Sequence, residues 1–157
     1  MISYGTGEAV ARLVETYGDL LLRLASTRLR SPADAEDAVQ EVFLYLLEHD
    51  VVFKSEAHEK AWLIRATIHR ACDLQKRAAR TDLPLEDAAI AAVPEPDDAL
   101  LDAVRALPEK YSAPLYLYYY AGYSIKEIGR LLGVPAATAG TRLARGRALL
   151  KELLQEE

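Results

Sequence analysis

The stretch that decides the fold is YSIKEIGRLLGVPAATAGTRLARGRALL, residues 123–150. Ser124 and Glu127 have the spacing of a capping box, which predicts that a helix begins here. Gly133 suits the left-handed turn that ends such a helix. A second helix is predicted after Pro135. Two helices joined by a short glycine-containing turn are typical of a helix-turn-helix unit.

The second of these helices carries side chains that suit nucleic acid. They are Thr138, Thr141, Arg142, Arg145 and Arg147. Hydroxyl and guanidinium groups bind phosphates and base edges, and a purely structural helical hairpin needs no such run of arginines. The pattern therefore predicts DNA binding. Gly140 and Gly146 each lower helix stability by about 1 kcal/mol relative to alanine, so we expect this helix to be the least stable part of its domain until DNA or polymerase orders it.

The composition limits the class of protein. The chain has 157 residues, of which 51% are hydrophobic, and alternating apolar runs of the strand type are scarce. We therefore predict an all-α globular protein. The single cysteine, Cys72, excludes an internal disulfide and a cysteine-based zinc site. No cofactor is indicated, and no basic region followed by an apolar stretch marks export, so a cytoplasmic location is expected.

The net charge of −5 is unevenly distributed. Residues 81–97, TDLPLEDAAIAAVPEPD, hold five acidic side chains, no basic ones and three prolines. This segment is predicted to be a flexible acidic linker between two small helical domains, residues 1–80 and 98–157. We expect three helices in the first domain (about 8–29, one from 32, and 55–80). Four are expected in the second (about 98–106, 108–121, 125–132 and 136–154).

The helix that follows Ser31 has an apolar stripe and an acidic face. The stripe is Ala35, Ala38, Val39, Val42, Phe43, Leu46 and Leu47; the acidic face is Asp34, Asp37 and Glu41, with Gln40 beside them. The acidic face is open to two interpretations: a solvated surface whose charge suits the helix N-terminus, or a docking site for a basic partner. A metal site is disfavoured, because no histidine lies three or four residues away.

The third predicted helix has an aromatic side chain among cations. Its residues Trp62, Arg65, His69, Asp73, Lys76 and Arg80 fall within about 60° of one another around the helix axis. An aromatic ring between cations suits stacking on bases and holding phosphates. Packing of Trp62 on the first helix is the alternative. The three histidines have no metal-site spacing, and no catalytic residues are indicated.

Three stretches together carry a resemblance to a known family. They are DAEDAVQEVFLYLLEH (34–49), EKAWLIRATIHRACDLQKRAAR (59–80) and the long segment 107–154 that contains the helix-turn-helix. In this order, with a linker between, they resemble the extracytoplasmic-function (ECF) sigma factors, the small initiation subunits of bacterial RNA polymerase. The resemblance implies a region 2-like and a region 4-like domain. It also implies promoter recognition, DNA melting and no enzymatic activity.

The resemblance assigns roles to the two faces of the first domain. Asp34, Asp37, Gln40 and Glu41 are implied to bind the β′ clamp helices of the polymerase core. At the −10 element, Trp62 is implied to act as an aromatic wedge, with Arg65, Lys76 and Arg80 on phosphates. Lys54 belongs to the loop FKSEAH (53–58), which with His69 is implied to form a pocket for a flipped base.

The resemblance places helix 136–154 in the major groove of the −35 element. Thr138, Thr141 and Arg142 would read bases, with Arg145 and Arg147 on phosphates, and apolar positions around Tyr116 and Leu153 would meet the β flap. An anti-sigma factor is a further implied partner. Residues 136–140 read AATAG, where the family often has polar side chains, which predicts a lax −35 preference. His69 stands where the family often has asparagine.

Two other classes of protein remain possible from the residues alone. One is a helix-turn-helix transcriptional regulator that acts without a sigma role. The other is a protein-interaction adaptor whose DNA-binding helix has decayed. The dependence of DNA binding on polymerase separates a regulator from a sigma factor, because a regulator binds duplex DNA alone, whereas a sigma factor binds it poorly without core enzyme.

Overall fold

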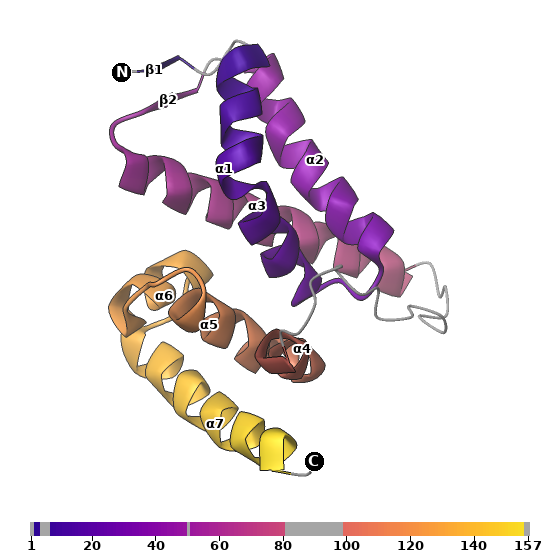
Figure 1. Ribbon diagram of the computed structural model, residues 1–157, viewed down its shortest axis with the longest axis vertical. Helices are drawn as coiled ribbons and strands as arrows, with labels where there is room; N and C mark the ends of the chain where they lie inside the picture. The colour runs from indigo at the N-terminus through magenta and orange to yellow at the C-terminus, as the bar shows by residue number, and fades with distance from the viewer. Residues whose placement is uncertain (1, 4–6, 50, 81–98, 156–157) are drawn as a thin grey trace. The chain divides into compact units, whose positions relative to one another are not determined.

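The computed structural model describes residues 2–3, 7–49, 51–80 and 99–155 (Figure 1), and only the backbone of residues 2–3 and 78–80. The chain divides into two compact units, Met1–Ala91 and Ala92–Glu157. Within the described ranges helices make up nearly all the regular structure, which confirms the all-α prediction. The predicted linker, 81–97, lies outside the described residues.

The first unit is a three-helix domain. Its helices are α1 (Gly7–Ser26), α2 (Pro32–Glu48) and α3 (Glu56–Arg80). Each of the three contacts both others, with α3 crossing α1 and α2 (Figure 1). The fully buried side chains Leu13, Leu21, Leu46 and Leu63 come from all three helices. One shared core therefore fixes the faces of α2 and α3 that point outward.

Two details of the first unit differ from the sequence-based expectation. Strand β1 (Ile2–Ser3) pairs antiparallel with β2 (Val52–Phe53), although no strand was expected. Helix α1 ends at Ser26 rather than near residue 29. The hydroxyls of Ser26 and Thr27 donate to the Arg23 and Leu24 carbonyls, at 2.6 and 2.7 Å. These side chains compete for the carbonyls of the last turn, which favours ending the helix.

The second unit is a four-helix domain. It consists of α4 (Ala99–Ala106), α5 (Glu109–Tyr119), α6 (Ile125–Leu132) and α7 (Ala136–Gln155). Helix α7 packs against the other three. The core contains the fully buried side chains Leu115, Tyr116, Ile128 and Leu143. The long C-terminal helix is thus buried along one side and open along the other.

The turn between α6 and α7 has the predicted chemistry. Ser124 and Glu127 form both hydrogen bonds of the capping box, at 3.2 and 3.0 Å. Gly133 ends α6 with φ 71°, in the left-handed region. A Cβ atom on Gly129 would lie 2.8 Å from the Val134 carbonyl oxygen, so only glycine fits there. The helix-turn-helix prediction is confirmed.

No helix of the described ranges is long and apolar enough to cross a membrane. Within the same ranges, no cluster of three or more His, Cys, Asp or Glu side chains is placed to hold a metal ion.

Candidate nucleic-acid interface

The acidic face of α2 is divided by the way the helix packs. Asp37 and Gln40 are exposed, whereas Asp34 and Glu41 are half-buried. Oε2 of Glu41 lies 3.6 Å from Nε of Arg70 on α3. Counting about 100° per residue, Asp37 lies opposite the core and Glu41 turns toward α3. The four predicted residues therefore share one side of α2 but differ in solvent exposure.

Two leucines extend the outer face of α2 beyond the acidic residues. Leu44 and Leu47 are 51% and 43% exposed. Leu47 was predicted to belong to the buried stripe, and that prediction is wrong. It lies about 100° from Leu46, which points directly into the core. The outer face is therefore acidic in its first half and apolar in its second, a combination that suits a protein partner.

The cationic face of α3 is open along its length. Arg65, His69, Asp73 and Lys76 are all exposed, as the helical period predicts. The side chain of Arg80 lies outside the described residues. The helix begins after Ser55, whose hydroxyl accepts from the His58 amide at 3.1 Å. The face therefore presents three described nitrogen-bearing side chains with one carboxylate among them.

Trp62 is half-buried and lies between two other rings. Its ring centroid lies 5.9 Å from that of Tyr45 and 5.5 Å from that of Phe53. One neighbour is near the end of α2 and the other is in β2. Trp62 is therefore positioned by aromatic contacts at the open end of the α3 face.

The loop before α3 is held by a histidine. The Lys54 amide donates to Nδ1 of His58 at 3.0 Å, and the side chains of both residues are exposed. His69 follows His58 by eleven residues, about 16 Å along the helix axis. The predicted pocket between this loop and His69 stays a prediction.

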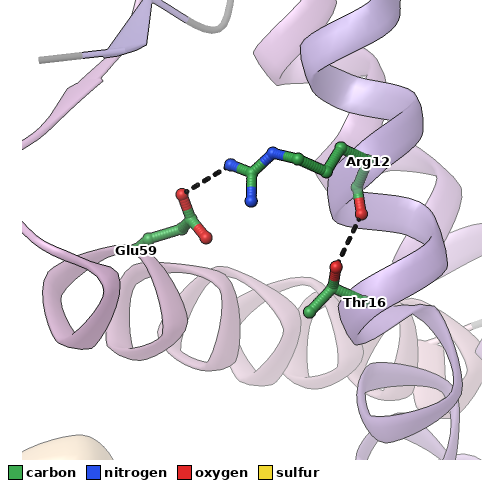
Figure 2. A network of polar contacts seen from close by, with 3 residues as sticks. All are labelled: Arg12, Thr16 and Glu59. Atoms are coloured by element: carbon green, nitrogen blue, oxygen red, sulfur yellow. Dashed lines mark hydrogen bonds and ion pairs between the residues drawn. The ribbon is translucent and has the colours of Figure 1, made fainter.

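A buried carboxylate that the sequence analysis missed ties α1 to α3. Glu59 is 3% exposed and accepts a hydrogen bond from Nη2 of Arg12 at 3.4 Å (Figure 2). The Thr16 hydroxyl donates to the Arg12 carbonyl at 2.9 Å. Burial, followed by the charge of Glu59, raises the pKa of Tyr17. Glu59 lies four residues before buried Leu63, so the helical period indicates its burial.

In the second unit, α5 and α7 enclose a cationic hollow of about 370 Å³. Its lining residues are Lys110, Tyr111, Ala137, Thr138, Thr141, Arg142 and Arg145, with no carboxylate among them. Within the described part of the chain, Lys110, Arg142 and Arg145 form no ion pair. Four of the five residues predicted to touch the −35 element thus meet at one place, joined by Lys110, which the sequence analysis missed.

Arg147, the fifth predicted residue, lies elsewhere. Its Nε donates to the Tyr119 hydroxyl at 2.9 Å, and its guanidinium lies 4.8 Å from the Tyr118 ring centroid. The hydrogen bond with Tyr119 raises the pKa of Arg147. Arg147 follows Arg142 by five residues, which rotates it by about 140° around the axis. Helix α7 therefore separates its arginines onto two flanks.

The two glycines inside α7 have different surroundings. A Cβ on Gly140 would make an ordinary contact with Ile125 Cγ2 at 3.6 Å. A Cβ on Gly146 would lie 3.0 Å from Leu115 Cδ1 and 3.3 Å from Tyr111 Cβ. Gly146 therefore allows the close approach of α7 to α5, whereas Gly140 serves no packing need.

Comparison with known families matches both units. The model of "Sigma-70 region 2" matches residues 13–81, and that of "Sigma-70, region 4" matches residues 97–150. The ECF RNA polymerase sigma factor SigM of Mycobacterium tuberculosis is 34% identical, over 96% of this chain and 79% of its own length. SigW of Bacillus subtilis is 27% identical, over 99% of this chain and 94% of its own length.

Solved structures also resemble this chain. CnrH, in complex with the cytosolic domain of CnrY, matches with a TM-score of 0.63 and 25% identity, over 98% of this chain and 92% of CnrH. The sigma factor RpoE from Bartonella quintana, in complex with the anti-sigma factor NepR, has a TM-score of 0.69 over 92% of this chain and 97% of RpoE. At 21% identity it supports the fold alone.

These matches define the class first: a protein built of sigma-70 regions 2 and 4. More closely, the chain belongs to the ECF family of RNA polymerase sigma factors. It is therefore an RNA polymerase sigma factor for transcription initiation, and the resemblance found in the sequence is confirmed.

Proposed function

We propose that the chain binds core polymerase through α2, melts and reads the −10 element through α3, and binds the −35 element through α7. The observation that carries this proposal is the pair of unlike outward faces on one small domain. The outer face of α2 is acidic and apolar, whereas that of α3 is cationic and aromatic. A protein that binds DNA alone has no use for the first of these faces.

The outer face of α2 suits the β′ clamp helices. Asp37 and Gln40 are exposed and provide the first polar contacts, and Leu44 adds apolar area. Charge complementarity there steers association and sets specificity. Asp34 and Glu41 flank this centre. Because Glu41 is paired with Arg70, it contributes less to docking than Asp37.

The α3 face suits DNA in the course of melting. Trp62 supplies a flat ring at one end, held by its neighbours, and wedges against the upstream edge of the melted region. Arg65 and Lys76, with Arg80, bind phosphates, and Lys54 approaches the strand from the loop. His69 sets the preference at one −10 position. No step in this scheme requires catalysis by the protein itself.

The hollow between α5 and α7 suits the −35 element. Thr138, Thr141 and Arg142 face base edges, and Arg145 binds a phosphate. Lys110 adds a second phosphate contact from α5, because it lines the same hollow without a paired carboxylate. Arg147 contacts the DNA backbone only from the other flank of α7. Ala136, Ala137 and Ala139 offer no side-chain hydrogen bonds to bases, so selectivity for the −35 sequence is weak and depends partly on DNA shape.

Two further partners are proposed, one from the surface of the second unit and one from the solved relatives. The C-terminal end of α7 exposes Leu153 and Leu154, which suits the β flap. Tyr116 was expected near that contact but is only 1% exposed, so it supports the core instead. The solved relatives are complexes with NepR and with the cytosolic domain of CnrY, and an anti-sigma factor is proposed for this chain as well, with the cytoplasm as its site of action.

The polymerase dependence of DNA binding tests the proposal. A fluorescent promoter duplex is titrated with the chain alone, with core polymerase alone, and with both, and anisotropy reports binding. We expect tight, promoter-specific binding only for the mixture. Equal binding by the chain alone would instead favour a helix-turn-helix regulator without a sigma role.

A further inference from the structure

A row of five rings runs from the end of α2 across β2 to the start of α3. Its members, in order, are His49, Tyr45, Trp62, Phe53 and His58. The successive centroid distances are 3.9, 5.9, 5.5 and 5.3 Å. Trp62 lies at the middle of the row, so the rings on its α2 side extend the aromatic surface beyond the residue already proposed to touch DNA.

The α2 end of this row is a fixed, open stack. The rings of Tyr45 and His49 are nearly parallel, with an interplanar angle of 15°. Tyr45 is 40% exposed and His49 is exposed as well. Nδ1 of His49 lies 3.0 Å from the Tyr45 carbonyl oxygen. A carbonyl only accepts, so Nδ1 carries the proton, and this bond fixes the orientation of the imidazole.

If the Tyr45–His49 stack served only to end α2, the imidazole would not have to be held in one orientation. His49, the C-cap residue of α2, follows Tyr45 by four positions, a spacing that brings side chains together at a helix surface, and this contact explains one face of each ring. It does not explain why the pair adjoins Trp62 and stays exposed. A ring held in place before binding loses little freedom when a base stacks on it.

We propose that the Tyr45–His49 stack is a second stacking platform, which takes an unpaired nucleobase of the melted promoter strand beside Trp62. The proposal rests on the proposed function, since an unpaired base exists only once the promoter is open. Stacking does not depend on base identity, because every base has a π-face. The platform therefore stabilises the open complex without adding sequence preference.

The test scans the non-template strand with 2-aminopurine, whose fluorescence falls when it stacks. Holoenzyme formed with the full chain is bound to promoter DNA carrying the probe at each position of the melted region in turn. We expect one position next to the Trp62 contact to be quenched with wild-type protein and bright with His49→Ala. His49→Phe keeps a ring at the site and should restore the quenching. Binding of a premelted promoter should weaken about five-fold or more with His49→Ala.

Val14→Ala is the control, because it removes an exposed apolar side chain from α1, outside the row and outside the proposed polymerase- and DNA-binding faces. It should leave every probe position unchanged. The platform is overturned if all positions are as quenched with His49→Ala as with wild type, or if Val14→Ala brightens the same position. If the wild-type holoenzyme leaves every probe position paired and therefore quenched, the promoter is not melted, and the proposed function is overturned instead.

Discussion

On α3 the aromatic side chain proposed to touch DNA is packed between two other rings, whereas on α7 the proposed cations line an open hollow. Beside the α3 face, Arg70 is already paired with Glu41. Around the hollow, Arg142 and Arg145 have no ion-pair partner within the described ranges. Trp62 and Glu41 of the first unit are therefore held by internal contacts, whereas the arginines that line the hollow of the second unit are open to a ligand. Substitutions of Trp62 and Glu41 should change stability and binding together, whereas those at the hollow, or at exposed Asp37, should change binding alone.

The largest effect is expected for Asp37→Arg. Asp37 is exposed and opposite the core, so reversing its charge changes stability by about 0.5 kcal/mol or less. Like charges across an interface cost several kcal/mol, so binding to core polymerase in a pull-down should be lost.

Glu41→Arg is the comparison for that variant. It also places a second cation beside Arg70, from which Glu41 lies 3.6 Å away. We expect a smaller loss of polymerase binding than for Asp37→Arg and a measurable loss of stability. Equal, unchanged binding for both variants would leave the acidic face a solvated surface.

Trp62→Ala should impair promoter melting more than initial promoter binding. Permanganate footprinting measures the melting. The variant also loses two aromatic contacts, each worth about 0.5–1.5 kcal/mol. Trp62→Phe keeps much of the packing and is the control for folding. Normal melting by a destabilised Trp62→Ala protein would restrict this residue to a packing role.

The two glycines of α7 should respond with opposite signs. Gly140→Ala gains about 1 kcal/mol of helix stability, because its Cβ meets only an ordinary contact. Gly146→Ala forces a Cβ against Leu115 and Tyr111, and overpacking of this kind costs about 1–3 kcal/mol. Thermal unfolding measures both. Gly140→Lys should add a phosphate contact to the same gain, seen as stronger −35-dependent transcription. A loss of stability in either Gly140 variant would contradict this assignment.

The smallest effect is expected from single cations at the second unit. Lys110→Ala should lower the salt-dependence slope of holoenzyme binding to −35 DNA by about one, with stability unchanged. Arg147→Ala should change the slope less and stability more, since it removes contacts with Tyr118 and Tyr119. A reversed order for the two variants would mean that the flank carrying Arg147 is the one that meets DNA.

The features that the sequence predicts are those that depend on local chemistry. The capping box at Ser124 and the left-handed Gly133 locate the helix-turn-helix. The helical period correctly exposes Arg65, His69 and Lys76 on one face. Both depend on neighbours within about one or two turns, which a single helix defines.

The parts that the sequence did not reveal depend on contacts between distant segments. Arg12 and Glu59 are 47 residues apart, and Arg147 and Tyr119 are 28 apart. Two arginines on one helix look alike until the tyrosines of another helix hold one of them. The same holds for Gly140 and Gly146, whose difference lies in what α5 and α6 place beside each Cβ.

Run-off transcription tests most directly whether the chain directs core polymerase to promoters. Core bacterial polymerase is supplied with a randomised promoter library, with the wild-type chain, with the Asp37→Arg variant, or with neither. We expect discrete transcripts only with the wild-type chain, enriched for a defined −10 sequence and a looser −35 sequence. Absence of any discrete transcript, together with promoter binding by the chain alone, would contradict this expectation.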